Sequence, residues 1–502
     1  MKQKSLGIVL SYILILLDLA IGILFVPFLL KTLGGEEYGL YKLMLATASY
    51  LSVLDFGLGG TITRYVIKYK TENDRKKEEN LLAMGFTIYG ILALCVILLA
   101  VVISFCIPRI YRASIMAEQF HYAKSIFLFV CTNTAVNLCN HAYNGLLLAY
   151  ERYVYQRIVN IFKVLLRVTL LVGILPVIKY GIVIAGIDLI LSVSILLLNA
   201  GYTKYVLKCT IRLHEWDFGL LREMLVFTSA ILMQSVINQF NSNVDSMVLG
   251  MFTTTTTVAM YSIVLQLFTM YSTLSTAVSS VYLPAISKAV FKGADDDEVT
   301  KRVVEPSRIQ LMILLLALSG FLLFGKDFIK LWVGTEYLGV YPLACVLLIS
   351  STLELSQNSI TSVLKAKNIL HGKTWILFGS TAVNVLLTVM LVPEFGAAGA
   401  VAGTAFSMVF GYGIALNVYY QKKAGLNMRL YYKQTYSGIL MAAAISFGFG
   451  CVFTNIMCCK TFFGFFRNAG IYSCIYVVIM LLLGVNRRER IIVLKSIKYI
   501  DK

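Results

Sequence analysis

The sequence predicts an all-α polytopic membrane protein with about fourteen transmembrane helices. Three observations support this class. The 502-residue chain is 58% hydrophobic and only 14% charged, whereas soluble domains carry about 25% charged residues. Long uncharged apolar runs recur from end to end, in place of the short alternating segments typical of a β-barrel. Finally, the basic residues concentrate on alternate loops, as a chain that crosses a membrane repeatedly would require.

Each predicted span is an apolar run of about 18 residues or more. The first begins at Ile8 and has no small-residue cleavage site, so we expect a transmembrane helix there instead of a signal peptide. Two spans, at 39–62 and 121–147, are more polar than the others and are supported by the charge pattern. The predicted spans are 8–30, 39–62, 81–107, 121–147, 155–178, 181–203, 224–249, 258–282, 309–326, 341–364, 374–392, 396–420, 434–457 and 464–485.

The distribution of Lys and Arg predicts the orientation of the chain. With the N-terminus in the cytoplasm, 32 of the 44 basic residues lie in inside segments or at the span ends beside them, and eight lie in outside loops or at the span ends beside them. The other four, Lys42, Lys124, Lys163 and Arg167, lie further inside spans. This asymmetry is the positive-inside rule, so we expect both termini in the cytoplasm. It also accounts for the net charge of +18 without a nucleic-acid partner, because no basic patch lies on a soluble domain.

Three short sequence matches recur at nearly one offset. They are Leu33-Gly34 with Leu249-Gly250 (offset 216), Tyr180-Gly181 with Phe395-Gly396 (215), and Leu147–Ala149 with Leu364–Ala366 (217). Six predicted helices separate the copies, and this even number gives both copies the same orientation. Internal repeats of this kind are common in transporters. We therefore predict two parallel six-helix lobes, 1–210 and 211–425, followed by a helix pair and a basic cytoplasmic tail in 426–502.

Polar side chains follow one face of several predicted helices. The span at 121–147 carries Asn133, Asn137, Asn140, His141 and Asn144, and similar stripes occur in the spans at 224–249 and 341–364. Interhelical hydrogen bonds would explain any single amide, but whole stripes favour a hydrated central cavity. Amides both donate and accept, which suits sugar hydroxyls. The predicted sugar-binding residues are Asn133, Asn137, His141, Asn144, Asn238, Asn241 and Asn358.

Two cations lie deep in the predicted span at 155–178. Lys163 and Arg167 are four residues apart, so they share one helical face. At roughly 1.5 Å per residue they lie about 12 and 18 Å from the start of the helix, where a charge is costly without water, a partner or an anion. Lys163 could reach the cytoplasmic surface by snorkelling, and Arg167 could pair with Asp18, Asp188 or Glu354. The functional interpretation is that both hold an anionic head group, since guanidinium grips phosphate oxygens bidentately.

Four carboxylates in the spans are candidates for a coupling Na⁺ or H⁺: Asp18, Asp188, Asp245 and Glu354. The sequence offers no catalytic motif and predicts no other cofactor or metal. Asp295, Asp296 and Asp297 contain a DxD pattern, but no nucleotide-binding domain surrounds it, so a solvated loop or a helix start explains it better. We therefore predict a transporter instead of an enzyme.

Several stretches carry a resemblance to a known family. They are PFLLKTLGGEEYGLYKL and LSVLDFGLGGTITRY in the first two spans, NGLLLAYERYVYQR at 144–157, LKAKNILHGKTW at 364–375, and NVLLTVMLVPEFGAAGAVAGTAFS at 384–407. These resemble the polysaccharide and O-antigen flippases of the multidrug/oligosaccharidyl-lipid/polysaccharide exporter superfamily. The resemblance covers nearly the whole chain and marks the superfamily better than the substrate.

The resemblance implies the two-lobed architecture of the multidrug exporters with alternating access. It implies transfer of an undecaprenyl-pyrophosphate-linked oligosaccharide, such as an O-antigen, capsule or exopolysaccharide repeat unit, from the inner to the outer leaflet of the bacterial cytoplasmic membrane. Membrane lipids, a polysaccharide polymerase and a chain-length regulator are the partners it suggests. In similar proteins the last two helices form a groove for the lipid tail. Lipid II flippases typically have arginines in their first two helices, where this chain has Asp18 and Lys42.

Two alternatives to a flippase follow from the same sequence. One is a cation-coupled multidrug antiporter, although such exporters usually have twelve helices. The other is a membrane polysaccharide polymerase or ligase, which usually needs a sizeable outside loop with catalytic Arg or His. The outside loops predicted here are all short.

Overall fold

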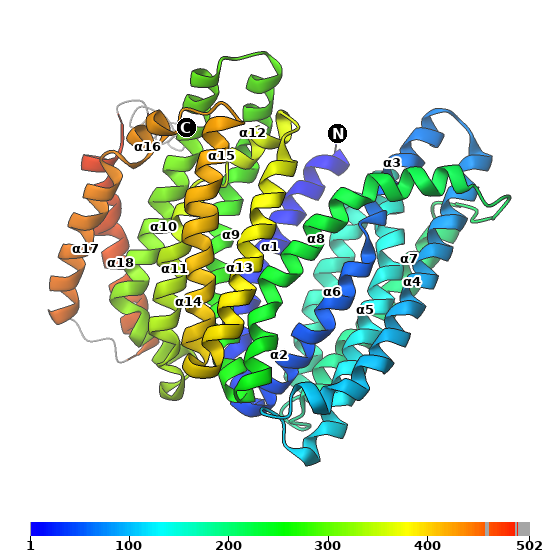
Figure 1. Cartoon of the computed structure of the whole chain (residues 1–502), viewed down its shortest axis with the longest axis horizontal. Helices are drawn as coiled ribbons and strands as arrows, with labels where there is room; N and C mark the ends of the chain where they lie inside the picture. The colour runs from blue at the N-terminus through cyan, green and yellow to red at the C-terminus, as the bar shows by residue number, and fades with distance from the viewer. Residues whose placement is uncertain (1, 457–460, 487–488, 490–502) are drawn as a thin grey trace. The chain divides into compact units, whose positions relative to one another are not determined.

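The computed structural model describes residues 2–456, 461–486 and Glu489. Within these residues the chain is helical and contains no strand (Figure 1). It divides into two compact units, residues 1–262 and 263–502, with the boundary inside α9. The predicted lobe limits at 210/211 and 425/426 stay a prediction. Apart from Glu489, the predicted basic tail after Asn486 lies outside the described residues.

The helices of unit 1 follow one another with short connections. They are α1 (Lys2–Leu33), α2 (Gly35–Ser49), η1 (Tyr50–Asp55), α3 (Leu58–Thr71), α4 (Arg75–Ile110), η2 (Ala117–Gln119), α5 (Phe120–Ala149), α6 (Tyr153–Ile174), α7 (Gly181–Tyr205), α8 (Phe218–Phe252) and the start of α9 (Thr255–Phe291). The central helix is α5, which packs against α2, α3, α4 and α7. Because α5 carries the longest polar stripe, that stripe lies in the interior of unit 1.

Unit 2 is organised around α10 (Asp296–Trp332), which packs against α11, α16, α17 and α18. Asp295 caps α10 by accepting a hydrogen bond from the Glu298 backbone amide, so the acidic run is a helix start. The other helices are η3 (Thr335–Tyr337), α11 (Val340–Ser356), α12 (Ile360–Ala366), α13 (Leu370–Phe395), α14 (Ala397–Ser407), η4 (Met408–Ala415), α15 (Leu416–Lys422), α16 (Met428–Tyr436), α17 (Ile439–Ile456), α18 (Phe462–Ile479) and η5 (Met480–Gly484).

The all-α polytopic class is confirmed, and within the described residues each predicted span is mostly helical. Ten helices of the described chain are long and apolar enough to cross a membrane, and the bent pair α11–α12 would make eleven. The remaining predicted spans correspond to α5, α6 and α8, of 30, 22 and 35 residues. Of these three helices, α5 and α8 carry polar stripes and α6 carries the two deep cations, so their polarity separates them from the other ten.

Two predicted spans are broken, which the sequence analysis did not foresee. The span at 39–62 divides into α2, η1 and α3, and the break ends with Phe56 (φ 52°) and Gly57 (φ 69°), both left-handed. A positive φ costs a non-glycine residue energy and marks an interruption held by its surroundings. The span at 341–364 bends by 44° between α11 and α12. Both breaks place backbone and polar groups where a straight helix would not.

Candidate functional site

A polar pocket lies inside unit 1, between η1, α5 and α8. We call it the unit 1 pocket, and its volume is about 460 Å³. It is lined by Ser52, Val53, Asp55, Thr134, Asn137, Leu138, His141, Ser235, Asn238, Gln239 and Ser242. Only Val53 and Leu138 of these are apolar. A cavity walled by hydroxyls and amides among membrane helices is expected to hold water or a polar ligand, since hydrocarbon could not satisfy those groups.

The charged group of this pocket is Asp55, at the end of η1. One oxygen of its carboxylate, Oδ1, accepts a hydrogen bond from the Tyr89 hydroxyl at 2.9 Å. The other, Oδ2, lies 3.1 Å from Nδ1 of His141. Nearby, the Gln239 amide donates to the Ser52 hydroxyl and so ties α8 to η1. The sequence analysis named His141 but not Asp55, whose role depends on the break in its span.

The amide stripe of α5 is divided among three surroundings. Asn137 lines the pocket and donates to Oδ1 of Asn133 at 3.3 Å. Asn140 is buried and donates to the Ser192 carbonyl of α7 at 3.1 Å. Asn144 accepts from the Gln156 amide of α6 at 3.1 Å. The stripe therefore serves both packing, at Asn140 and Asn144, and the pocket, at Asn137 and His141.

The stripe of α8 is divided in the same way. Asn238 lines the unit 1 pocket and accepts a hydrogen bond of 3.0 Å from Gln234. Asp245 is only 2% exposed, and its carboxylate accepts from the Tyr261 hydroxyl at 2.6 Å. Asn241 is half-buried outside the lining of the pocket. Asp18 is exposed on α1 and does not line the pocket.

A cationic cluster forms where α2, α6 and α7 meet. Arg167 holds Asp188 bidentately, with Nε at 2.5 Å from Oδ1 and Nη2 at 2.9 Å from Oδ2. Lys163 lies 3.4 Å from the Ser192 hydroxyl and also interacts electrostatically with Asp188. Lys42 of α2 interacts electrostatically with Arg167. The cluster of Lys42, Lys163, Arg167 and Asp188 thus has three cationic groups and one carboxylate.

Two of the predicted residues, Glu354 and Asn358, lie together in unit 2. They line a smaller cavity of about 110 Å³ with Lys373 of α13 and two tyrosines, Tyr412 and Tyr420. Lys373 donates to the Thr361 hydroxyl at 2.8 Å and interacts electrostatically with Glu354. Lys373 was not among the predicted site residues, since its position near a loop gave no sign that it would be half-buried.

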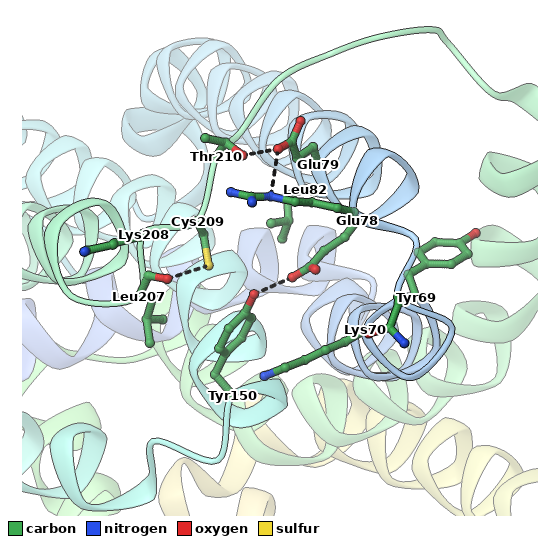
Figure 2. A pocket seen from close by; sticks show the side chains of 12 residues that line it. Tyr69, Lys70, Glu78, Glu79, Leu82, Tyr150, Leu207, Lys208, Cys209 and Thr210 are labelled. Carbon is green, nitrogen blue, oxygen red and sulfur yellow. Dashed lines mark hydrogen bonds and ion pairs between the residues drawn. The ribbon is translucent and has the colours of Figure 1, made fainter.

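A second cavity of unit 1, of about 530 Å³, lies where α3 ends and α4 begins (Figure 2). The Tyr150 hydroxyl donates to Glu78 at 2.6 Å, and the Lys70 ammonium lies 3.7 Å from the centre of the Tyr150 ring. Thr210 donates to Glu79, which ties the segment after α7 to the start of α4. Burial raises the pKa of both the Tyr150 hydroxyl and the Cys209 thiol. These contacts engage both glutamates, Glu78 and Glu79, with protein donors.

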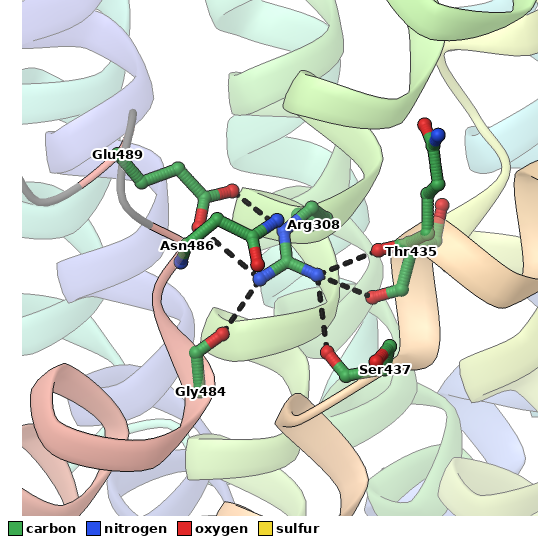
Figure 3. Close-up of polar contacts among 7 residues, drawn as sticks. Arg308, Thr435, Ser437, Gly484, Asn486 and Glu489 are labelled. Atoms are coloured by element: carbon green, nitrogen blue, oxygen red, sulfur yellow. Dashed lines mark hydrogen bonds and ion pairs between the residues drawn. The ribbon is translucent and has the colours of Figure 1, made fainter.

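Arg308 is the largest departure from what the sequence suggested. The prediction left it in a loop, but it is 1% exposed inside α10 (Figure 3). Its guanidinium pairs bidentately with Glu489 at 2.6 and 3.1 Å. It also donates to the backbone carbonyls of four residues: Gln434, Thr435, Ser437 and Gly484. Arg308 therefore fastens the ends of α16 and η5 to α10.

The fold and the polar cavities define a multi-pass membrane protein of the transporter type. Comparisons with known proteins identify the family. Residues 6–290 match the family of polysaccharide biosynthesis proteins, and the chain belongs to it.

Two curated relatives come from Haloferax volcanii. The chain is 29% identical over 173 residues to "Probable flippase AglR", covering 33% of this chain and 35% of that protein. It is 24% identical over 275 residues to "Probable low-salt glycan biosynthesis flippase Agl15", covering 53% and 57% respectively. The matches thus span about a third and somewhat over half of the lengths of these relatives.

Solved structures share the fold. "Lipid II flippase MurJ, inward closed conformation" matches with a TM-score of 0.71 and 15% identity, over 95% of this chain and 98% of that chain. An inward-facing MATE family multidrug resistance transporter matches with a TM-score of 0.59 and 14% identity, over 82% and 96%. The predicted fold class is therefore confirmed, and the match over residues 6–290 confirms the predicted polysaccharide family.

Proposed function

We propose that this protein is a flippase that moves a lipid-linked oligosaccharide from the cytoplasmic to the outer leaflet of the membrane in which it lies. Its family and the printed names of its relatives support this function. In its specific form, the proposal names the substrate as an undecaprenyl-pyrophosphate-linked repeat unit. It places the protein in a bacterial cytoplasmic membrane with both termini in the cytoplasm. Movement would follow alternating access, without an enzymatic step on the sugar.

The observation that carries the proposal is the unit 1 pocket. A glycan head group presents many hydroxyls, and each needs a donor or acceptor once it leaves water. The pocket supplies hydroxyls, amides and one imidazole from three different elements, η1, α5 and α8. Its volume of about 460 Å³ falls within the range of about 300–1,000 Å³ typical of small-ligand sites. We assign the sugars nearest the lipid to this pocket.

The diphosphate would bind at the cationic cluster. If all four groups are ionised, Lys42, Lys163 and Arg167 outweigh Asp188 and leave a net charge of +2. Arg167 uses Nε and Nη2 for Asp188, and its guanidinium also interacts with the Tyr41 hydroxyl. A guanidinium has five N–H donors, so others are left for a phosphate oxygen. The carboxylate would hold the guanidinium in place, and phosphate would neutralise the remaining charge. The proposed role of Asp188 is therefore to orient Arg167, as an alternative to binding a coupling ion.

A coupling Na⁺ or H⁺ is part of the proposal, and the structure suggests an order among its candidates. Asp245 is engaged with Tyr261 and Asp188 with Arg167, whereas Glu354 lines a cavity and Asp18 is exposed. We therefore rank Glu354 first. A polysaccharide polymerase and a chain-length regulator are proposed partners, and α17–α18 are proposed to guide the lipid tail.

Reconstitution tests the function directly. The purified protein is reconstituted in vesicles, and an undecaprenyl-diphosphate-linked oligosaccharide is added to their outer leaflet. A glycosidase added outside then measures the fraction of oligosaccharide that is still accessible in that leaflet. We expect the accessible fraction to fall with time in protein-containing vesicles only. The Thr169→Ala variant, an exposed change on α6, serves as a control that should act like the wild type. Equal accessibility in protein-free and protein-containing vesicles would refute the proposal.

The drug-antiporter alternative has a separate test with the same vesicles. A fluorescent cationic dye and an imposed Na⁺ or H⁺ gradient replace the lipid-linked sugar. We expect dye movement no faster than in protein-free vesicles. Dye export without glycan flipping would favour the antiporter instead.

A further inference from the structure

The break in the second membrane segment brings Asp55 into contact with His141. Two glycines make this contact possible. The backbone at Gly59 lies so close to α5 that a Cβ added at Gly145 would be 2.4 Å from the Gly59 carbonyl oxygen. A Cβ on Gly59 would lie 3.1 Å from the His141 carbonyl oxygen. Thr63 adds a hydrogen bond of 2.9 Å to the Gly145 carbonyl. The start of α3 is thus fixed against the turn of α5 that carries His141.

The hydrogen bonds around Asp55 determine which imidazole nitrogen carries the proton. An ionised carboxylate accepts only, so Nδ1 of His141 must donate to Oδ2 of Asp55. The Tyr89 hydroxyl donates to Oδ1 at 2.9 Å, so each carboxylate oxygen of Asp55 has its own partner, Tyr89 on one side and His141 on the other.

A neutral His141 with its proton on Nδ1 has a free lone pair on Nε2. The side chain is 45% exposed and lines the unit 1 pocket, so Nε2 is available to a ligand there. No Lys or Arg is among the residues that line the pocket, and the one charged group is the Asp55 carboxylate. Such a site repels phosphate. It suits an uncharged group that can donate a hydrogen bond.

We propose that Asp55 is a positioning residue that holds His141 as a hydrogen-bond acceptor for a sugar hydroxyl. This inference rests on the proposed function and makes it more specific. The neutral sugars bind in the unit 1 pocket, and the diphosphate binds apart from it, at the cationic cluster. Asp55 contacts the sugar only through His141, and Tyr89 fixes Asp55.

The tautomer can be measured without any transport assay. The chain has four histidines, and the ¹⁵N signals of His141 are those missing from a His141→Gln spectrum of the full-length protein. At about pH 9, well above the usual imidazole range, we expect the wild type to show Nδ1 protonated and Nε2 unprotonated. In Asp55→Asn the new amide must donate toward Nδ1, because Tyr89 occupies the other side, so the proton should move to Nε2. Tyr89→Phe is the matched control and should keep the wild-type tautomer.

Flipping of the lipid-linked oligosaccharide in vesicles is the second measurement. His141→Phe and Asp55→Asn should slow flipping about threefold to tenfold, the effect of one lost hydrogen bond. His141→Gln should restore part of the flipping that His141→Phe loses, because the Gln amide oxygen can reach the position of Nε2 and accept the same hydrogen bond. A wild-type Nε2–H tautomer, an unchanged tautomer in Asp55→Asn, or full activity of His141→Phe would each overturn the proposal. If the wild type itself does not flip the lipid-linked oligosaccharide, the flippase function is refuted. The ¹⁵N measurement of the His141 tautomer does not depend on that outcome.

Discussion

Arg167 has an observed partner, Asp188, and a proposed one, phosphate, and a single substitution would remove both contacts. In Arg167→Ala the Asp188 carboxylate loses its bidentate partner. The two side chains are 30% and 20% exposed, so water offsets part of the loss, and we expect destabilisation of about 1–3 kcal/mol. Loss of the cation should also abolish glycan flipping, since the guanidinium no longer reaches the diphosphate. Thermal unfolding in detergent and the vesicle assay measure the two effects separately.

The double variant Arg167→Ala/Asp188→Ala separates the roles. Removing both partners leaves no carboxylate without its guanidinium, so we expect stability to return part of the way toward the wild type. The return is partial because Lys163 also loses its interaction with Asp188. Flipping should stay absent, because the phosphate-binding group is still missing. If flipping returned with stability, Arg167 would serve only to neutralise Asp188, and its proposed role in binding phosphate would be wrong.

At the residue scale, the sequence predicted which charged side chains lie deep in the membrane spans better than it predicted which residues they contact. The depth of Lys163 and Arg167 follows from helix geometry alone, and Asp188 was one of three acids that could pair with Arg167. Which acid does so depends on how α6 packs against α7, and sequence spacing does not contain that information. Lys42 was recognised as a basic residue within a span, but its approach to Arg167 depends on the position of α2. Asp55 reaches His141 only because its span is broken.

At the element scale, the approach of α3 to α5 depends on the absence of a side chain at Gly145. In Gly145→Ala the new Cβ would lie 2.4 Å from the Gly59 carbonyl oxygen, so the backbone of one element must move. Overpacking of this kind costs about 1–3 kcal/mol, and it should also separate Asp55 from His141. Thermal unfolding and the His141 tautomer report the two consequences.

Gly173→Ala in α6 is the matched control. A Cβ at Gly173 has no neighbour within 4 Å among the described residues, and alanine favours a helix over glycine by about 0.8–1.0 kcal/mol. We expect this variant to be as stable as the wild type or more so. Equal stability of Gly145→Ala and Gly173→Ala would mean that the α3–α5 approach is loose.

The α10 helix holds the C-terminal helices through one side chain. In Arg308→Leu, the Glu489 carboxylate and the four carbonyls lose their donor at a buried position. Breaking a buried ion pair in this way costs about 3–5 kcal/mol, on the order of 10 °C in unfolding temperature. Glu489→Gln should cost less, because its amide oxygen still accepts and the carbonyl bonds remain. Thermal unfolding of both variants measures the difference, and an Arg308→Leu protein as stable as Glu489→Gln would contradict the prediction.

The existence of the helices was predictable, whereas their interruptions were not. Apolar run length and alternating basic loops indicate every span, including the polar helices α5, α6 and α8 that hydropathy alone passes over. The break at Tyr50–Asp55 has only Gly57 as a sequence signal, because Phe56 takes its left-handed conformation from its surroundings. The burial of Arg308 likewise depends on carbonyls supplied by the ends of α16 and η5, more than 120 residues further along the chain.

At the scale of the whole molecule, two of the three repeated sequence matches fall at comparable places in the two halves of the chain. The third does not, because Gly34 lies between α1 and α2, whereas Gly250 lies inside α8. Gly181 begins α7, and Gly396 precedes α14 as its cap. Ala149 ends α5, and Ala366 ends α12. A duplicated six-helix unit would produce such correspondences. The predicted lobes remain a prediction, because these correspondences concern helix ends and not the relation of one lobe to the other.

The orientation of the chain in the membrane follows from its basic residues, and two exposed positions test it. In a variant without the ten native cysteines, a cysteine at Lys292, between α9 and α10, should react with a membrane-impermeant maleimide only in inverted vesicles. A cysteine at Arg112, after α4, should react only in intact cells. The physical reason is that the segments rich in Lys and Arg stay on the cytoplasmic side, and the two positions are separated by an odd number of predicted crossings. Labelling of both from one side would refute the predicted number of spans between them. The reverse labelling pattern would place both termini outside the cytoplasm. The orientation of the proposed flippase relative to its substrate leaflet would then also be reversed.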